Sequence, residues 1–289
     1  MPDWSSITQH LRDAGISLER EATPRPVGGG DISAAWRLDA GDRALFLKTG
    51  PVTSAEMFAA EAEGLTEIAL ANALRVPEVF AIGQTADTAF LALEWLPFER
   101  PDVACEQRLG EQLAMMHRTS KDRFGWHRDN TIGLTAQHNR WSADWTEFFR
   151  EQRLGYQLEL AAKNGYGGEL QRQGRRLLER LPSLLKDYQP SASLLHGDLW
   201  GGNWASSEGE PVIFDPAVYY GDRETDLAMT RLFGGFGRAF YDAYEAAWPL
   251  SPGSTERQHL YQLYHVLNHL NLFGGGYKSR ALSLIRALL

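Results

Sequence analysis

The first third of the chain alternates apolar and polar positions with the two-residue period of β-strands. An Ala-Gly-Asp turn at 40–42 separates two of these segments, which predicts a hairpin. Further along, apolar residues such as Phe58 and Leu65 recur with helical spacing. We therefore expect strands over 32–38, 44–48, 76–82 and 88–95, a helix over 54–73, a first short helix over 4–11 capped by Asp3, and a turn-rich loop over 24–31.

After Pro97 the pattern changes to helical segments separated by short strands. We expect helices over 102–117, 141–163, 169–181 and from 226 onward, strands over 192–196 and 211–214, and an irregular stretch over 118–140. This order predicts an α+β fold with two lobes. Residues 1–96 would form a small antiparallel-sheet N-lobe with one main helix, and residues 97–289 a larger, mostly helical C-lobe, joined near residues 94–97.

Composition and charge exclude several classes of protein. The 289 residues carry a net charge of −8, so a global basic field for nucleic acid or anionic lipid is absent. The single Cys105 excludes an intramolecular disulfide and a multi-cysteine zinc site. No run reaches the ~18 apolar residues of a membrane span, and the N-terminus lacks the basic and apolar regions of a signal peptide. We expect a cytoplasmic protein that binds neither nucleic acid nor membranes.

The stretch that is richest in candidate chemistry is LLHGDLWGGNW, residues 194–204. Asp198 and Asn203 lie on a glycine-containing loop after a strand, and Asp215 ends the next apolar strand. A carboxylate beside a hydroxyl can accept its proton, and an amide with a second carboxylate offers oxygen ligands for Mg²⁺. Each residue alone is typical of a turn, but their joint spacing matches the phosphoryl-transfer site of kinases. We predict Asp198 as catalytic base and Asn203 and Asp215 as metal ligands.

A kinase also needs groups that hold the nucleotide. Gly28, Gly29 and Gly30 precede a strand, where backbone N–H groups can approach phosphates closely, although three glycines are also common in a plain loop. The segment LALEWLPF at 91–98 predicts a strand that runs into a linker. In a two-lobed kinase this linker meets the adenine edge, so the Glu94 C=O and the Leu96 N–H are the candidate contacts.

Lys48 ends the strand segment ALFLK and is a candidate for binding nucleotide phosphates. The alternative is an edge-strand lysine in water, which is the usual fate of this residue type. A buried lysine needs a counter-charge to stay ionised. Glu61 lies beside the apolar stripe of the following helix and is the expected partner, whereas Glu56 and Glu63 are expected to be solvated.

Motifs along nearly the whole chain carry a family resemblance. They are GGGDIS (28–33), FLKTG (46–50), MFAAEAEGL (57–65), LEWL (93–96), FGWHRDNTIGLTAQHN (124–139), DWTEFFREQRL (144–154), LLHGDLWGGNW (194–204), FDPAVYYGDRETDLAM (214–229), FGGFGRAF (233–240) and YQLYHVLNHLNLFG (261–274). With them the chain resembles the fructosamine/ketosamine kinase family, a branch of the aminoglycoside-phosphotransferase and protein-kinase-like fold.

The resemblance implies ATP-dependent phosphorylation of the 3-hydroxyl of a ketosamine, the adduct that a reducing sugar forms with an amine, as part of protein deglycation. The implied cofactors are ATP and Mg²⁺, and the acceptor is a small ketosamine or a glycated protein lysine. By position, His196 resembles a structural residue of the catalytic loop, Asp226 the acid that ties this loop down, and Trp200 a substrate-facing aromatic. We expect a monomer or a weak dimer.

The chain departs from related kinases at two places. The triplet Phe214-Asp215-Pro216 stands where protein kinases have Asp-Phe-Gly, which favours a small-molecule kinase without a mobile activation loop. Asp31 stands where eukaryotic relatives tend to carry a cysteine, so a disulfide-linked dimer through the glycine-rich loop is not available here.

The acceptor side offers weaker signals. Asn268 and Asn271 lie three positions apart on the C-terminal helix, which places both on one face and predicts that they line a cleft; a solvated face is the alternative. His265 and His269 have helical spacing, but no Glu-x-x-His context supports a zinc site.

Two other functions remain open at this stage. One is another phosphotransferase of the same fold that acts on an aminoglycoside, choline or a thiosugar. The other is a non-catalytic nucleotide-binding scaffold, which the joint presence of Lys48, Asp198, Asn203 and Asp215 disfavours.

Overall fold

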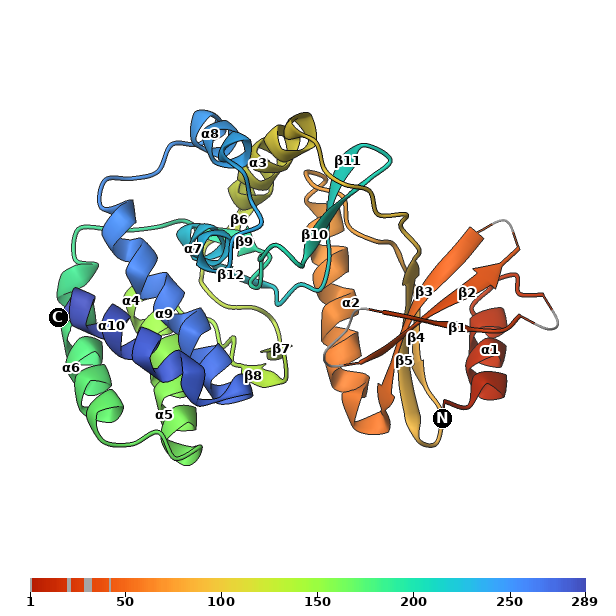
Figure 1. Cartoon of the computed structure of the whole chain (residues 1–289), viewed down its shortest axis with the longest axis horizontal. Helices are drawn as coiled ribbons and strands as arrows, with labels where there is room; N and C mark the ends of the chain where they lie inside the picture. The colour runs from red at the N-terminus through yellow and green to blue at the C-terminus, as the bar shows by residue number, and fades with distance from the viewer. Residues whose placement is uncertain (1, 20–21, 29–32, 42) are drawn as a thin grey trace.

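The computed structural model describes residues 2–19, 22–28, 33–41 and 43–289, so Gly29, Gly30 and Asp31 lie outside the described residues. A twisted antiparallel sheet stands at the N-terminal end of the molecule and a mostly helical part at the other (Figure 1). The five-stranded sheet has the order β1-β2-β3-β5-β4. Its strands are β1 (Arg25–Val27), β2 (Ala34–Ala40), β3 (Arg43–Pro51), β4 (Val79–Gln84) and β5 (Thr88–Glu94).

The side chains of this sheet alternate between its two faces, so apolar side chains lie on both. One helix covers each face (Figure 1). The helices are α1 (Trp4–Asp13) and α2 (Ala55–Leu70), with a short 3-10 turn η1 (Val52–Ser54) before α2. Ile7 of α1 packs in one cluster with Leu47 of β3, whereas Phe58 of α2 packs on the other face with Leu91 of β5. Lys48 follows Leu47 in β3 and therefore points to the α2 face.

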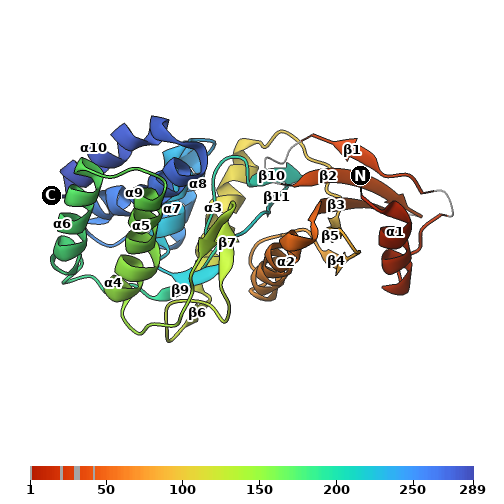
Figure 2. The ribbon, with the colours of Figure 1, turned by 90° about the horizontal axis from the view of Figure 1, so that it is seen from below.

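The remainder of the chain is mostly helical (Figure 2). Its helices are α3 (Val103–Arg118), α4 (Trp145–Phe148), the π-helix η2 (Phe149–Gly155), α5 (Tyr156–Lys163), α6 (Glu169–Leu184), α7 (Glu224–Leu232), α8 (Arg238–Ala247), α9 (Ser254–Phe273), the 3-10 turn η3 (Gly275–Tyr277) and α10 (Lys278–Leu288). Its strands are β6 (Ser120–Lys121), β7 (Asn130–Ile132), β8 (Thr135–Gln137), β9 (Ala192–Leu195), β10 (Trp204–Ser207), β11 (Glu210–Ile213) and β12 (Tyr219–Gly221). They form the three-stranded sheet β12-β9-β6 and the hairpins β7–β8 and β10–β11.

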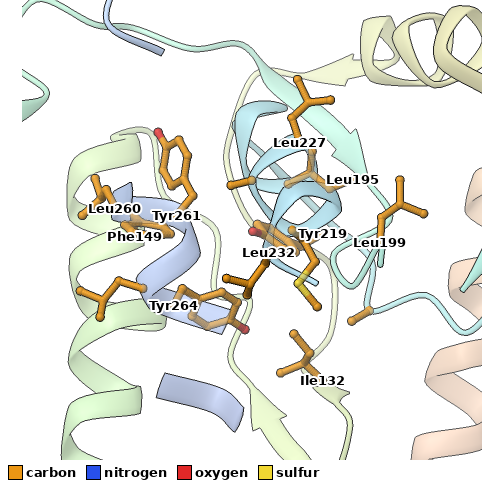
Figure 3. Close-up of a cluster of buried hydrophobic side chains, with 14 of the residues drawn as sticks. Ile132, Phe149, Leu195, Leu199, Tyr219, Leu227, Leu232, Leu260, Tyr261 and Tyr264 are labelled. Atoms are coloured by element: carbon orange, nitrogen blue, oxygen red, sulfur yellow. The ribbon is translucent and has the colours of Figure 1, made fainter. Parts of the chain in front are cut away.

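A large apolar core underlies the loop that follows β9. Leu195 at the end of β9 and Leu199 in the loop are both fully buried, and they lie near Leu227 of α7 and Tyr219 of β12 (Figure 3). Burial of a leucine side chain stabilises the fold by about 1.5–3 kcal/mol. The loop is therefore anchored by its apolar residues on both sides of Asp198, which leaves the polar residues between them to face the site.

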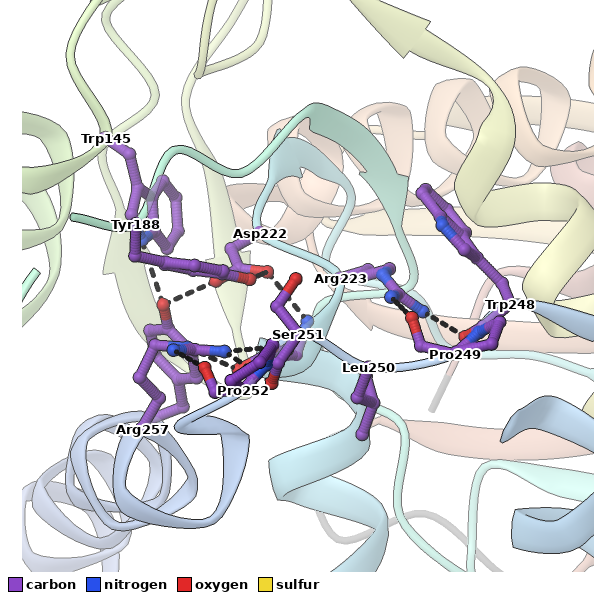
Figure 4. Close-up of polar contacts among 12 residues, drawn as sticks. Trp145, Tyr188, Asp222, Arg223, Trp248, Pro249, Leu250, Ser251, Pro252 and Arg257 are labelled. Atoms are coloured by element: carbon purple, nitrogen blue, oxygen red, sulfur yellow. Dashed lines mark hydrogen bonds and ion pairs between the residues drawn. The ribbon is translucent and has the colours of Figure 1, made fainter. Parts of the chain in front are cut away.

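A second, polar network holds the start of α7 to α9 and to the segment before it (Figure 4). Arg223 donates to the carbonyl oxygens of Trp248 and Pro249, at 2.8 and 2.6 Å. Arg257 pairs with Glu224 through two bonds of 2.8 and 2.7 Å. Each of these arginines also lies over an aromatic ring, which replaces part of the hydration that burial removes.

The predicted α+β architecture is confirmed, and so is Asp3 as the cap of the first helix, since its carboxylate accepts from the Ser6 N–H. Three expectations were wrong in detail. The loop expected over 24–31 contains the edge strand β1, and the stretch expected to be irregular over 118–140 contains β6, β7 and β8. The single helix expected over 141–163 is divided by the π-helix η2, since hydrophobic periodicity does not detect one extra residue in a turn. Among the described residues, no helix is both long and apolar enough to cross a bilayer.

Candidate active site

Lys48 is the centre of an ionic cluster between the sheet and the helical part, in which Lys48 and Glu61 are largely buried and Asp215 is partly exposed. The Nζ of Lys48 lies 2.6 Å from Glu61 Oε1 and 2.6 Å from Asp215 Oδ1. Only 8% of the residue is exposed. Burial alone lowers the pKa of Lys48, but the charges of the two carboxylates outweigh it, so the pKa is raised above its usual value and the ammonium stays charged. Burial also raises the pKa of Glu61, against the charge of Lys48.

The loop after β9 is held by the carboxylate of Asp226 at the start of α7. Asp226 accepts from the backbone N–H groups of His196 and Gly197, at 2.8 and 2.9 Å. His117 of α3 also bonds to it, with 3.2 Å between Nε2 and Oδ2. Burial raises the pKa of Asp226, but these hydrogen bonds and the neighbouring histidines outweigh it and keep the pKa low. Asp226 thus orients the loop as an ionised carboxylate.

Gly197 and His196 connect this loop to the segment after Asp215. Gly197 has φ +84°, and a Cβ at this position would overlap the carbonyl oxygen of Ala217, so only glycine fits. The Ala217 N–H donates to the His196 carbonyl at 2.8 Å. The His196 ring bonds to the Phe214 carbonyl, with Nε2 at 2.9 Å. His196 therefore has a positioning role between the two loops in this structure.

Asp198 and Asn203 meet on the same loop. Asn203 Nδ2 donates to the backbone oxygen of Asp198 at 2.8 Å and approaches its Oδ2 at 3.4 Å. The Asn203 carbonyl in turn accepts from the Phe214 N–H at 3.0 Å, which joins the loop to the strand that leads to Asp215. Burial and the nearby charges of Asp215 and Asp226 raise the pKa of Asp198 well above its usual range. The structure thus brings Asp198, Asn203 and Asp215 together.

The backbone at Asp215 is strained, with φ +58° in a residue other than glycine. Such left-handed backbone in a residue with a side chain costs of order 1–3 kcal/mol and is concentrated at functional sites. It turns the carboxylate out of the strand direction toward Lys48, where 46% of the side chain is exposed. Asp215 is therefore accessible to a ligand that enters between the sheet and the helical part.

The predicted adenine contacts lie where β5 leaves the sheet. Leu96 is buried, and the Glu94 carboxylate is paired with Arg75 at 2.9 Å. Arg75 also reaches Glu208 in the β10–β11 turn at 3.1 Å, so it braces this linker against the helical part. Nothing in the sequence pattern singled out Arg75, because its partners are distant in the chain.

Phe98 and Phe214 form a further feature that the sequence did not reveal. Their rings stack with centroids 5.0 Å apart and 15° between the planes. Phe98 is 58% exposed, directly after the linker, and Phe214 directly precedes Asp215. The pair presents an aromatic surface between the linker and the ionic cluster.

The glycine-rich segment is only partly described, since Gly29 and Gly30 lie outside the described residues. At Gly28, a Cβ would meet no atom of the described residues within 4 Å.

The candidate acceptor residues have different surroundings from one another. Trp200 is 41% exposed, and its ring covers Gly202 so closely that a Cβ at Gly202 would overlap it. Asn268 is buried, and its Oδ1 accepts from Gln157 of α5 at 3.3 Å. Asn271 Nδ2 donates to the side-chain oxygen of Gln157 at 2.8 Å. The two asparagines do share one face of α9, and that face contacts Gln157 of α5; their part in binding an acceptor stays a prediction.

Arg128 lies beside the remaining acids on α2. Glu63 and Glu56 were expected to be solvated, and 43% and 88% of their side chains are exposed; both also pair with Arg128, at 2.7 and 2.6 Å. Among the described residues, no group of three or more histidine, cysteine, aspartate or glutamate side chains is arranged to hold a metal ion. A cation at this site would therefore depend on Asp215, an amide oxygen and ligands from outside the chain.

A buried lysine between two carboxylates, facing a loop with an aspartate and an asparagine, defines the site of a kinase-like phosphotransferase. Solved structures agree with this fold: the aminoglycoside phosphotransferase APH(4)-Ia superposes with a TM-score of 0.67 at 15% identity and covers 98% of both chains. The fructosamine kinase family model matches residues 3–289. The chain belongs to the fructosamine kinase family.

Individual relatives support the same assignment. A Synechocystis protein that bears the name probable ketoamine kinase is 43% identical over 288 residues. The match covers 99% of this chain and 97% of the relative's chain. A chloroplastic protein-ribulosamine 3-kinase of Oryza sativa subsp. indica is 42% identical over 90% of this chain and 76% of its own. The crystal structure of a Haemophilus somnus protein assigned as a fructosamine-3-kinase has a TM-score of 0.90, with 29% identity over 99% of this chain and 97% of its own.

Proposed function

We propose that this protein is an ATP-dependent kinase that transfers the γ-phosphoryl group to the 3-hydroxyl of a ketosamine. Its relatives bear the names ketoamine kinase and protein-ribulosamine 3-kinase. The observation that carries the proposal is the convergence of Lys48, Asp198, Asn203 and Asp215 from separate segments at one site. Residues 1–96 would supply most nucleotide contacts and residues 97–289 the catalytic loop and the acceptor site.

Lys48 is the proposed phosphate contact. Its ammonium is already charged and is held by Glu61 on one side, so a nucleotide phosphate can replace Asp215 as its second partner without moving the lysine. The glycine-rich segment 28–30 would add backbone N–H groups, and the linker would contact adenine through Glu94 and Leu96. A relative of the fold, APH(4)-Ia, has been crystallised with ADP and with AMP-PNP.

The donor atoms at the site fit Mg²⁺. Asn203 donates through Nδ2 to Asp198, so its Oδ1 is the atom left to act as ligand, and Asp215 adds a carboxylate. One or two protein oxygens are typical of Mg²⁺ in kinases, where phosphate oxygens and water complete the octahedron. When bound there, the ion would offset the negative charge of the phosphates. Binding of the ion would require the Asp215 carboxylate to leave Lys48 and to bind the cation instead.

Asp198 is the proposed catalytic base. Its backbone is held by Asn203 and its loop by Asp226, so the carboxylate has a defined place from which to bond the acceptor hydroxyl. Trp200, two residues further and partly exposed, is the proposed contact for the C–H face of the sugar. Positioning and charge neutralisation supply most of the rate gain for phosphoryl transfer.

The test is an ATP-coupled assay of the purified chain with fructoselysine, ribuloselysine and an aminoglycoside side by side. We expect turnover with at least one ketosamine, phosphorus NMR that places the new phosphate at C3, and no turnover with the aminoglycoside. Preferential phosphorylation of the aminoglycoside would favour the other branch of this fold. The absence of ATP turnover with every acceptor would contradict the proposal and favour the nucleotide-binding scaffold.

A further inference from the structure

The motif NTIGLTAQHN, residues 130–139, has no part in the phosphoryl-transfer chemistry described above, yet its polar side chains are buried. It forms the β7–β8 hairpin, in which Asn130 and Gln137 are directly opposite each other. Asn130 is 8% exposed, and Gln137 and Asn139 are each 1% exposed. Buried amides are costly unless they are hydrogen-bonded, so their partners reveal what the hairpin holds.

One set of partners is the backbone directly after Asp215. Asn130 Nδ2 donates to the Val218 carbonyl at 2.8 Å, and Gln137 Nε2 donates to the Ala217 carbonyl at 3.0 Å. Gln137 also donates to Asn130 Oδ1 at 2.9 Å and accepts from the Tyr264 hydroxyl at 2.7 Å. The Gln137 amide is thereby fixed in orientation, and it holds a segment two residues from Asp215.

Two residues shortly before this motif, His127 and Arg128, bond to α2, the helix that carries Glu61. Arg128, just before the hairpin, donates to Glu63 at 2.7 Å and to Glu56 at 2.6 Å. His127 bonds the second oxygen of Glu63 at 2.7 Å. Burial raises the pKa of Glu63, but the hydrogen bonds from His127 and Arg128 outweigh it, so the pKa is lowered and the carboxylate stays charged.

The hairpin and α2 also touch the same short stretch of backbone. A Cβ at Gly64 would lie 3.1 Å from Val218 Cγ2 and 3.5 Å from Pro216 Cγ, so α2 packs directly on the residues after Asp215. In Figure 1, β7 and β8 lie beside α2 at the edge of the helical part. The Asn139 side chain donates to the Arg128 carbonyl at 3.1 Å, which ties the arginine to the hairpin network.

These contacts close a ring around the nucleotide site. Lys48 joins Glu61 to Asp215, and the path returns from α2 through Arg128 and the hairpin to the backbone of Ala217 and Val218. We infer that Arg128 and the β7–β8 hairpin are a positioning element, which sets the separation of Glu61 and Asp215 and thereby the place of the Lys48 ammonium. This inference rests on the proposed function for the role of Lys48, but not for the contacts themselves.

The test compares Arg128→Gln with Arg140→Gln in the full chain. Arg140 lies in the same region but is 81% exposed and pairs only weakly with Glu151, at 3.6 Å, so it is the matched control for loss of one positive charge. Hydrogen–deuterium exchange of the nucleotide-free proteins is the first measurement. We expect faster exchange over residues 55–70 in Arg128→Gln, with unchanged exchange over 204–213 and no change in Arg140→Gln.

Nucleotide binding is the second measurement. Calorimetry with Mg²⁺-ADP should show affinity weakened by about tenfold in Arg128→Gln, because partial loss of a charge-assisted hydrogen bond to a phosphate has an effect of about this size. Arg128→Lys, which keeps the charge but not the two-pronged geometry, should fall between the wild type and Arg128→Gln. In an active enzyme, the KM for ATP should rise while the KM for the ketosamine stays within twofold.

The proposal fails if Arg128→Gln is folded and keeps both its α2 exchange and its affinity for Mg²⁺-ADP. The proposal would also fail if Arg128→Gln did not fold, because Arg128 would then have a general structural role. Exchange and ADP affinity do not depend on the acceptor. If the wild type phosphorylated no ketosamine, these two measurements would still decide the role of the hairpin.

Discussion

Lys48 and Asp215 are 167 positions apart in the chain, and their side chains meet at 2.6 Å. This contact joins the sheet to the loop after β11, and it places the one ammonium of the site beside the carboxylate that we propose as a metal ligand. Glu61 holds the same ammonium from α2. The three residues define the position at which a nucleotide phosphate would enter.

Loss of the carboxylate at Asp198 is expected to remove the base without disturbing the loop. Asp198→Asn preserves the backbone bond from Asn203 and the size of the side chain. We expect kcat to fall by about 10²–10⁴ while the KM for ATP stays within a few-fold. Steady-state kinetics with ATP and a ketosamine are the measurement, and wild-type turnover in this variant would show that another group accepts the proton.

Replacement of Lys48 by methionine is expected to abolish the stabilisation of the protein by bound nucleotide. Lys48→Met leaves Glu61 and Asp215 without their common cation, and Glu61 is largely buried. We expect the Tm of the free protein to fall, and the rise in Tm that Mg²⁺-ATP causes in the wild type to disappear. Melting curves with and without nucleotide measure this. An undiminished rise would mean that Lys48 does not contact the phosphates.

Gly197 is expected to tolerate no side chain. Gly197→Ala combines positive φ with overlap on the Ala217 carbonyl, whereas Gly209→Ala has φ +78° but no atom within 4 Å of the new Cβ. The control should lose about 1–2 kcal/mol of unfolding free energy from backbone strain alone. Gly197→Ala should lose at least about 2 kcal/mol more, because backbone cannot move aside cheaply. Urea unfolding of both variants decides it, and equal losses would contradict the packing argument.

Asp222 is expected to make stability decrease as the pH rises. Burial and the charge of Glu224 raise its pKa to about 7. Asp222 accepts from the hydroxyl of Tyr261 and from that of Tyr188, which Figure 4 shows beside it. An unfolded aspartate has a pKa of about 3.9. Between these values the folded state keeps a proton that the unfolded chain releases, so the unfolding free energy falls from about pH 4 to pH 7.

The measurement for Asp222 is the difference in Tm between the wild type and Asp222→Asn from pH 5 to pH 8. Buried histidines with lowered pKa, such as His265, give the opposite slope, and they cancel in this difference because both proteins contain them. We expect the variant to gain on the wild type as the pH rises. A pH-independent difference would show that Asp222 is already ionised at pH 5.

For each substitution, the change in activity is compared with the change in Tm of the same variant. A fall in activity with an unchanged Tm indicates the chemistry of the site, and a fall in both indicates the loop or the core. Asp198→Asn belongs to the first class of expectation and Gly197→Ala to the second.

The sequence determined the order of the elements and the local geometry of the loop. Alternation in β3 predicts which side chains share a face, and the spacing of Asp198 and Asn203 is short enough for one loop to bring them together. These features depend on neighbours along the chain, where periodicity and turn chemistry operate. The same local information predicted the Lys48–Glu61 contact, because a strand and the helix directly after it pack on each other.

Only the tertiary structure decided which distant groups share a charge or a hydrogen bond. From the sequence, Asn268 and Asn271 of α9 could equally line a cleft or lie on a solvated face. In the structure both contact Gln157 of α5, which the sequence did not predict. The sequence offered no prediction for Arg128, and its pairing with Glu63 follows only from the placement of α2 beside it. Pairing of this kind depends on how two separately formed units dock, and the free energy of docking is spread over many contacts that no short segment of sequence contains.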